Sequence, residues 1–400
     1  MSSEEARKQK ERQHHRLFSA DFIVWLSVLA VAASTLLYIL LNPEVSHPAG
    51  TPPPDETQAS AEHHSDHAHH LSLELRRLEQ KEALSNQFRK VYPKEILPLF
   101  FNHDYEKLWI PLYTWPPPWE QHYQIISNAE CWARDHEDSV IDDKLVSSYV
   151  GFQSSKTSDI EKYYDAMNSA AFEYVYHHEA FEHNRLNYSD TLLVLQQRQS
   201  PSKSVPIDDI FSTLNHLKAL AFALEHSSQT ENFSFSIEFL SKLHVDLSSN
   251  LQLAVPDSVD AELGVWRNHD AALGLSHVLT PYWIEVFPLM DRYIEWLNRC
   301  STELQESHSA SDDGRNWIRS ALFAFEALYR FTSINPFSNA NSKIARLIMN
   351  IILVKGGLPL VVISDPDATA YYSLWESPKD KLPFLRHHLE LLNRNLASYV

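Results

Sequence analysis

Glycine is scarce in this chain, with 7 residues among 400, against 21 prolines. This scarcity argues against a Rossmann-type or other glycine-loop enzyme, in which glycines let the backbone cradle phosphates. Cysteine is scarcer still: Cys131 and Cys300 cannot form a disulfide framework, and they are compatible with either one bridge or two buried thiols. Basic residues number 34 against 52 acidic ones, for a net charge of −18. We therefore expect no nucleic-acid binding, which needs clustered Lys and Arg.

The chain does contain one long uncharged run near its N-terminus, "FIVWLSVLAVAASTLLYILL" at residues 22–41. Twenty helical residues span about 30 Å, the thickness of the hydrocarbon core of a membrane. The segment that follows, "LNPEVSHPAG", offers no clear cleavage site. Five basic residues precede the run: Arg7, Lys8, Lys10, Arg12 and Arg16. By the positive-inside rule we expect a cytoplasmic tail at residues 1–21, a transmembrane helix at 22–41, and the rest of the chain on the far side, a type II arrangement.

Three further regions follow the hydrophobic run. Residues 42–70 are rich in Pro, Ser and His without hydrophobic periodicity, which predicts a disordered stalk and no metal site despite the histidines. Residues 71–158 mix a helical pattern with proline-broken aromatic segments, and we interpret them as an accessory region. Residues 159–400 show successive helical patterns, and only "AALGLSHV" and "PLVVIS" resemble strands. The predicted class is mainly α with one small β-hairpin.

The segment "FTSINPFSNANSKIARLIMN", residues 331–350, predicts a turn that leads into a helix. Asn335 before Pro336 favours a non-helical turn, and Asn341 is a suitable N-cap. Apolar residues then repeat at helical spacing and predict one buried face, and Gly356 is a natural helix stop. A tight loop at a helix N-terminus presents free backbone N–H groups, which suits a phosphate. The members of the apolar face are Ile344, Leu347, Ile348, Ile351 and Ile352.

This segment resembles the core motif of the Fic (Fido) family of AMP-transferases, His-Pro-Phe-x-(Asp/Glu)-(Gly/Ala)-Asn-(Gly/Lys)-Arg-x-x-Arg. The chain reads "NPFSNANSKIAR", in which Pro336, Phe337, Ala340, Asn341 and Arg346 fit the pattern. The likeness extends over roughly residues 160–400. It includes "LGVWR" at 263–267, similar to the family's Gly-x-(Tyr/Phe)-Arg element. Together with the membrane anchor it resembles the Fic AMP-transferases of the animal endoplasmic reticulum, and it implies a Fic helical fold with a β-hairpin flap.

The resemblance implies roles for residues of the motif, and four of them are altered. Position 335, the family's histidine general base, is Asn, whose amide cannot accept a proton. Position 339, the family's metal-holding carboxylate, is also Asn, which brings no charge to Mg²⁺. Ser342 and Lys343 stand for the family's Gly or Lys and its first Arg. The nucleotide-binding set implied by the family is Asn339, Ala340, Asn341, Ser342, Lys343 and Arg346.

Two other family elements are implied outside the motif. "YVYHHEAFEHNRL", residues 174–186, resembles the inhibitory helix, (Ser/Thr)-x-x-x-Glu-(Gly/Asn), and places Glu182 at the inhibitory position. Glu182 is expected to pair with Arg346, either as a retained lock or as a buried structural ion pair. "ALGLSHVLTP" falls where the family has its substrate-aligning flap, represented by Leu275, Ser276 and His277.

The leading hypothesis is a single-pass membrane protein of the endoplasmic reticulum with a catalytically impaired Fic domain. It would act by binding a protein, for which a lumenal chaperone and a second copy of the chain are candidates. ATP is the implied cofactor, with its binding weak or lost, and Mg²⁺ is doubtful. The alternative is an active nucleotidyltransferase or AMP-removing enzyme with a rearranged site that Glu182 regulates. An unrelated helical scaffold is the third hypothesis.

Overall fold

The computed structural model describes residues 130–132, 140–158, 160–197, 199–201, 205–229, 233–251, 262–268, 271, 280–281, 283–310, 314–364, 368–375 and 381–399. Residues 1–129 lie outside this part, and with them the predicted tail, transmembrane helix, stalk and most of the accessory region. No helix in the described ranges is long and apolar enough to span a bilayer.

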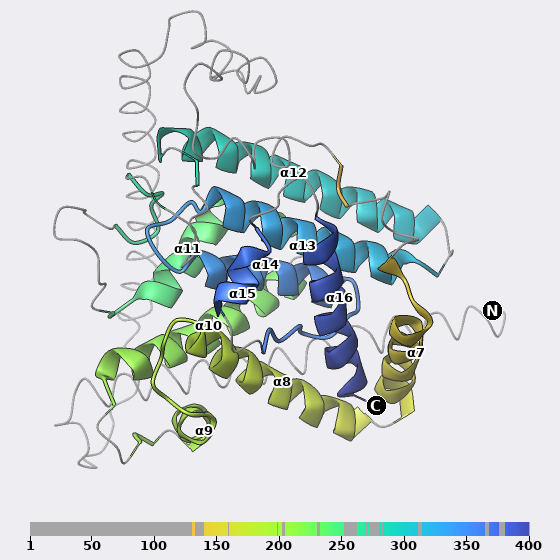
Figure 1. Ribbon diagram of the computed structural model, residues 1–400, viewed down its shortest axis with the longest axis horizontal. Coiled ribbons are helices and arrows are strands. Elements are labelled where there is room, and N and C mark those ends of the chain that lie inside the picture. The colour runs from red at the N-terminus through yellow and green to blue at the C-terminus, as the bar shows by residue number, and fades with distance from the viewer. Residues whose placement is uncertain are drawn as a thin grey trace, which may run out of the picture.

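The described residues form a helical bundle (Figure 1). Its elements are α7 (Asp143–Ser158), α8 (Ile160–Ala180), α9 (Tyr188–Gln197), α10 (Ile207–Gln229), α11 (Ile237–Ser248), α12 (Trp283–Ala310), α13 (Asn316–Ile334), α14 (Asn341–Lys355), α15 (Ala368–Ser373) and α16 (Leu382–Ala397). The mainly α prediction is confirmed. No strand occurs among the described residues, and the segment expected to form the flap hairpin, residues 272–279, lies outside them.

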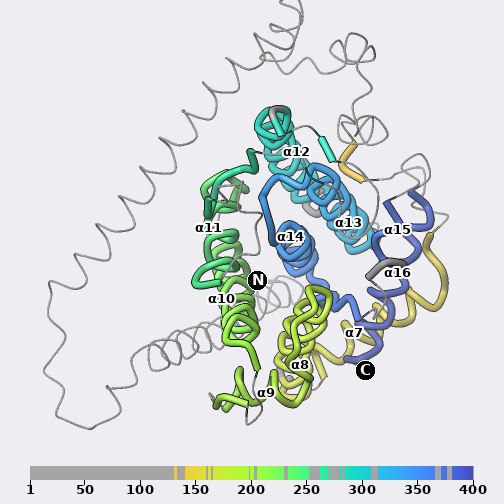
Figure 2. Tube along the Cα trace, turned by 60° about the vertical axis from the view of Figure 1, so that its left-hand side comes forward, coloured from red at the N-terminus to blue at the C-terminus, as the bar shows by residue number. Residues whose placement is uncertain are grey.

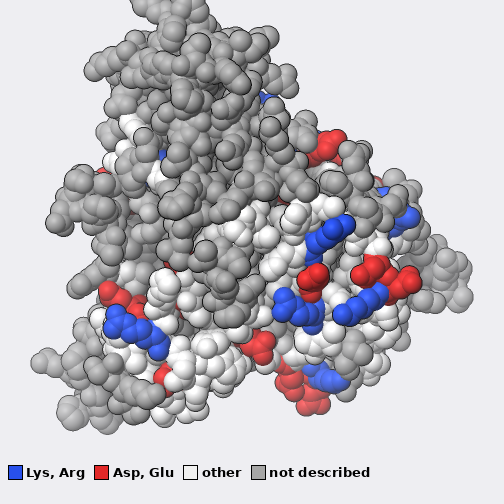
Figure 3. All heavy atoms as spheres, in the orientation of Figure 1, with Lys and Arg blue, Asp and Glu red and all other residues white. Residues whose placement is uncertain are grey.

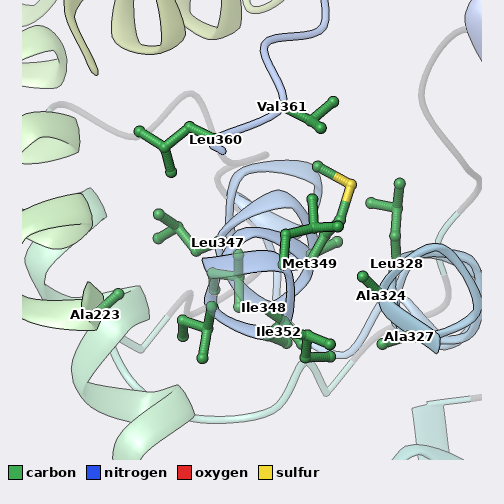
Figure 4. Close-up of a cluster of buried hydrophobic side chains, with 14 of the residues drawn as sticks. Ala223, Ala324, Ala327, Leu328, Leu347, Ile348, Met349, Ile352, Leu360 and Val361 are labelled. Carbon is green, nitrogen blue, oxygen red and sulfur yellow. The ribbon is translucent and has the colours of Figure 1, made fainter. Parts of the chain in front are cut away.

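Helix α14 occupies the centre of the bundle, surrounded by α8, α10, α11 and α13 (Figure 2). The predicted apolar face is buried, but so are Arg346 and Asn350 on its other side. The sequence pattern predicted one buried face, whereas α14 is buried on both sides. Helix α14 packs Leu347, Ile348 and Ile352 against α10 and α13, while Met349 lies near the segment that contains Leu360 and Val361 (Figure 4).

The run "PLVVIS", expected as a strand, is extended but does not join a sheet. Asparagine side chains take the place of a partner strand. Asn350 accepts a hydrogen bond from the Val361 N–H at 2.7 Å, and Asn395 of α16 accepts one from the Val362 N–H at 3.1 Å. These two side chains satisfy backbone groups that burial would otherwise leave unpaired.

The ends of α14 differ by one residue from the sequence prediction. The helix begins at Asn341 rather than Ser342, and Ala340 takes the N-cap position with φ 55°. At the other end Gly356 is the C-cap, and the left-handed residue is Gly357, with φ 78°. The Leu358 N–H bonds back to the Leu353 carbonyl and the Gly357 N–H to the Val354 carbonyl, which is the Schellman arrangement. Helix α11 is capped by Ser236, whose hydroxyl accepts a hydrogen bond from the Phe239 N–H.

One covalent cross-link joins distant parts of the chain. Cys131 and Cys300 form a disulfide across 169 residues, which decides between the two alternatives that the sequence left open. Cys300 lies on α12 and is fully buried. Helix α7 packs on α16 and α8, so the end of the predicted accessory region belongs to the helical body.

Candidate functional site

The site expected from the sequence is the loop of residues 335–340 between α13 and α14. Two of its residues adopt left-handed backbone conformations although neither is glycine: Asn335 has φ 51° and Ala340 has φ 55°. Asparagine tolerates this region better than most residues, and alanine does so at some cost. A contact within the loop must therefore offset the strain.

Asn341 supplies that contact. Its Oδ1 accepts a hydrogen bond from the Phe337 N–H, and its Nδ2 donates to the Phe337 carbonyl, both at 2.8 Å. Asn341 is 7% exposed, so these bonds lie away from solvent. The side chain thus closes the loop on itself and does not cap α14, contrary to the sequence prediction.

Phe337 anchors the loop to the body of the domain. Its side chain is fully buried, stacked on the His244 ring at 4.2 Å between centroids and packed against Trp266 at 4.6 Å. Neighbouring Arg267 holds the loop backbone: its N–H donates to the Pro336 carbonyl and its Nε donates to the Asn335 carbonyl, each at 2.8 Å. The element "LGVWR" therefore braces the loop.

Asn339 faces α11, through a network whose proton positions can be assigned. The Gly264 N–H donates to His244 Nδ1 at 2.8 Å, so the ring proton must sit on Nε2. Nε2 then donates to Asn339 Oδ1 at 2.8 Å, and the Ser248 hydroxyl donates to the same oxygen at 3.0 Å. Burial lowers the pKa of His244 to about 4, so the ring is neutral near pH 7. The oxygen that would stand for the family's metal-holding carboxylate already has two partners.

Lys343 enters a buried network that the sequence did not predict. Its Nζ lies 2.7 Å from Glu179 Oε1 of α8 and donates to the Ser212 hydroxyl of α10 at 3.0 Å. His216 Nδ1 is 2.8 Å from the same Glu179 oxygen. Burial by itself would raise the pKa of Glu179, but Lys343 and the hydrogen bond from His216 outweigh it and hold the pKa well below its ordinary value. The carboxylate is therefore charged and neutralises Lys343.

Glu182 lies one turn of chain beyond Glu179, and it does not contact Arg346. Its exposed carboxylate accepts a hydrogen bond from the Ser342 hydroxyl at 2.8 Å. His183, at the family's Gly or Asn position, has φ 62°, a left-handed conformation that Gly and Asn adopt more readily than other residues. The expected Glu182–Arg346 pair is not formed in this structure, and Glu179–Lys343 is the ion pair that joins α8 to α14.

Arg346 is enclosed by rings. It is fully buried, its guanidinium lies 5.5 Å from the centre of the Phe181 ring, and none of its three side-chain nitrogens has a hydrogen-bond partner among the described residues. The phenols of Tyr174 and Tyr371 and both ring nitrogens of His178 are likewise buried without such partners. Burial, together with the nearby charge of Arg346, keeps the pKa of His178 well below its ordinary value.

In the conformation of this structure, the residues of the loop do not fit a nucleoside triphosphate with its metal ion. Asn339 and Asn341 are engaged with the fold, Lys343 is neutralised by Glu179, and Arg346 is shielded from solvent. Asn335 offers an amide where a base would be needed. Within the described ranges no group of three His, Cys, Asp or Glu side chains could hold a metal ion. The expected flap residues Leu275, Ser276 and His277 lie outside those ranges.

Sequence reasoning missed Glu179, His216 and His244. Glu179 and Glu182 both lie in the segment compared with the inhibitory helix, and motif spacing selected the second. His216 and His244 lie on helices whose apolar pattern gave no reason to single them out. The spacing of Ser212 and His216, four residues apart on α10, could have indicated that their side chains share one face of the helix. Both side chains contact Glu179.

The comparisons with known proteins identify the family that the region around the loop resembles. Residues 234–353 match the model of the Fic/DOC family. A Drosophila virilis "Protein adenylyltransferase Fic" is 26% identical over 241 residues, which cover 59% of this chain and 44% of the relative. A Nematostella vectensis protein of the same name is 24% identical over 243 residues, covering 59% and 50%. The matched region thus spans about half the length of these curated relatives.

Two solved structures share the fold. The crystal structure of a Fic-domain-containing signaling protein from Bacteroides thetaiotaomicron has a TM-score of 0.51 at 19% identity, covering 63% of this chain and 94% of that one. Fic-1 from C. elegans, residues 134–508, has a TM-score of 0.50 at 23% identity, covering 64% and 70%. The protein is thus of the Fic helical class. Residues 234–353 carry the match to the Fic/DOC family, and the chain is distantly homologous to Fic protein adenylyltransferases.

Proposed function

We propose that this Fic domain no longer transfers AMP and acts instead by binding a protein. The observation that carries the proposal is the state of the motif loop. The polar side chains at the family's catalytic positions are replaced by ones of the wrong chemistry or engaged with other residues of the domain, and the retained Arg346 is fully buried. The loop has kept its structural residues, Phe337 and Asn341, and lost its chemical ones.

The missing base is the larger chemical loss. General-base catalysis contributes typically about 10²–10⁴-fold, and Asn335 cannot supply it at any useful pH. Neither neutral histidine near the loop supports a substitute role. His244 uses both ring nitrogens in hydrogen bonds, and His178 is fully buried beside Arg346. Of the described residues, neither of these two histidines could therefore take the proton of a target hydroxyl at the loop.

The missing positive charge compounds this loss. Phosphate binding needs cations that are exposed to the ligand and not already neutralised. Lys343 is 6% exposed and paired with Glu179, and Arg346 is fully buried. On the face of the molecule that Figure 3 shows, the described basic side chains lie beside acidic ones and form no basic patch.

We further propose that the domain lies in the lumen of the endoplasmic reticulum, held by a transmembrane helix at residues 22–41. The uncharged run and its preceding basic residues support the anchor. The Cys131–Cys300 bridge supports the compartment, because disulfides persist in oxidising environments. In that setting a lumenal chaperone is the first partner to test, and a second copy of the chain is the next.

The experiment combines a chemical and a binding measurement on the full chain. Purified protein is incubated with α-labelled ATP, Mg²⁺ or Mn²⁺, and a lumenal chaperone, with an active Fic enzyme as the assay control. We expect a complex with the chaperone and no label on it. Label that depends on residues 335–346 would refute the loss of activity, and absence of the complex would refute this partner.

A second candidate function is an active nucleotidyltransferase or AMP-removing enzyme controlled by Glu182. The unpartnered guanidinium of Arg346 favours it, because a buried cation without a counter-ion would be stabilised by an arriving anion. The exposed Glu182–Ser342 hydrogen bond is a contact that could open at little cost. This candidate predicts that Glu182→Ala or Arg346→Ala changes a measurable activity on AMP-modified or unmodified targets. Equal inactivity of both variants and the parent would dismiss it.

A further inference from the structure

A cavity of about 310 Å³ lies at the end of α14 opposite the motif loop. It is formed between α12, α13, the C-terminal turn of α14 and the segment that precedes α11. Because α14 has 15 residues, about 22 Å of helix separates this cavity from residues 335–340. The described residues that line it are Phe233, Phe235, Ser301, Leu304, Gln305, Phe323, Ile352, Lys355 and Gly356.

The wall of the cavity is mainly apolar and carries one cation. Three phenylalanine rings with Leu304 and Ile352 make up the apolar part. Lys355 supplies the only charged group among the described lining residues, and no Asp or Glu stands among them. A volume of this size lies at the lower end of the range for small-molecule sites, about 300–1,000 Å³.

The Lys355 ammonium is positioned but not neutralised. Its Nζ donates to the Ser227 carbonyl at 3.0 Å and lies 5.3 Å from the centre of the Phe233 ring. An ammonium has three donor hydrogens, so two remain for another acceptor. No ion pair to Lys355 forms within the described part of the chain; the residue is exposed, and partial burial of its ammonium lowers the pKa of that group.

The wall is also held in place before any ligand arrives. Asn298 of α12 accepts a hydrogen bond from the Phe235 N–H at 2.7 Å and donates to the Phe235 carbonyl at 2.8 Å. At the floor, a Cβ added to Gly356 would come within 2.5 Å of the Ser320 Cβ, so the backbone of α14 packs directly on α13. Such pre-organisation reduces the entropic cost of binding.

We propose that this cavity binds a small hydrophobic carboxylate. The apolar body would lie among the rings of Phe233, Phe235 and Phe323, and the carboxylate would accept hydrogen bonds from Lys355. A neutral ligand would leave the ammonium without an anionic partner, and a cationic ligand would face a like charge. The proposal concerns a different place from the motif loop and does not depend on the proposed function.

The test uses three probes of one shape: 3-phenylpropanoate, 3-phenylpropanol and 3-phenylpropylamine. Each is titrated calorimetrically into the full chain in lipid nanodiscs, with empty nanodiscs as the blank. We expect the acid to bind most tightly, the alcohol more weakly and the amine weakest. Lys355→Met should weaken binding of the acid about tenfold, because the carboxylate then loses its charged hydrogen-bond donor, and leave the alcohol nearly unchanged.

Two further variants keep the result interpretable. Lys144→Met removes an exposed lysine of α7 that does not line the cavity and should leave all three affinities as in the parent. Leu304→Trp should fill the cavity and abolish binding of all three, with thermal unfolding used to show that the variant folds. The proposal is overturned if the three probes bind alike, if Lys355→Met leaves the acid unaffected, or if the acid does not bind at millimolar concentration.

Discussion

At the residue scale, the most consequential contact is the buried ion pair between Glu179 and Lys343. It joins α8 to the first turn of α14 and uses the position where the family places its first motif arginine. Breaking such a pair by removing one partner is much more costly than replacing both, because the remaining charge is left buried. Lys343 is therefore better understood as part of the core than as a ligand-binding residue.

This account predicts that Glu179→Gln lowers the free energy of unfolding by about 3–5 kcal/mol near pH 7, measured by urea denaturation. Adding Lys343→Met should restore part of the loss, because the stranded charge is then removed. Glu182→Gln is the matched control and should cost less than about 0.5 kcal/mol, since its contact is exposed. A Glu179→Gln variant as stable as the parent would contradict the assignment.

The pH dependence of the unfolding free energy provides a second test of the Glu179–Lys343 pair. The pKa of Glu179 is depressed in the folded state from its ordinary value of 4.5. Its stabilisation is therefore fully present above pH 4.5 and is lost as the pH falls through the lower, folded-state pKa. The parent should lose this contribution on acidification, whereas Glu179→Gln, which has no such carboxylate, should not.

At the scale of elements, α14 is held by close backbone approach as well as by apolar side chains. Gly356 ends the helix where no Cβ fits beside Ser320 of α13. Gly356→Ala should therefore destabilise the protein by about 1–3 kcal/mol, the usual cost of overpacking. Ser320→Gly removes the obstructing atoms, so the double variant should lose less than the sum of the two single variants, by thermal or urea unfolding. If the losses in unfolding free energy of the two single variants simply add in the double variant, residues 356 and 320 are not in contact.

Particular residues explain what the sequence could and could not predict about these elements. The helices, and the approximate limits of α14, follow from apolar periodicity and from the glycines that stop it. The role of Arg267 could not be predicted from spacing, because it depends on a loop 68 residues away that folding brings close. The contact of Asn341 is local, but spacing alone did not show that its side chain bonds Phe337 and does not cap α14. Motif spacing also favoured Glu182 over Glu179, since spacing records a family's pattern and not which carboxylate faces the core here.

At the scale of the whole molecule, the Cys131–Cys300 bridge ties the region before α7 to α12. It closes a loop of 169 residues, which corresponds to about 5 kcal/mol in the chain-entropy model. We expect Cys131→Ser/Cys300→Ser to show a lower thermal midpoint than the parent without reductant, and reductant to lower the parent toward it. If unfolded, unreduced parent protein reacts with two equivalents of maleimide, the bridge is absent.

The proposed lumenal location makes a separate prediction for the sequon at Asn187. This residue is exposed, and its Oδ1 accepts a hydrogen bond from the Asp190 N–H at 2.9 Å, an interaction that leaves Nδ2 for a glycan. The full chain made in animal cells should therefore carry a glycan that a glycosidase removes, and Asn187→Gln should lose it. The second sequon, at Asn232, lies outside the described residues, and Asn232→Gln serves as the comparison. A chain without any glycan in such cells would contradict the lumenal location.

The central claim is that the polar residues of the motif loop serve the fold and not a nucleotide. The most direct test is a calorimetric titration of ATP, with Mg²⁺, into the full chain and into Lys343→Met. We predict no binding tighter than about 1 mM, the level at which only about 4 kcal/mol of interaction is available, in either protein. Micromolar binding by the parent that Lys343→Met abolishes would contradict the claim.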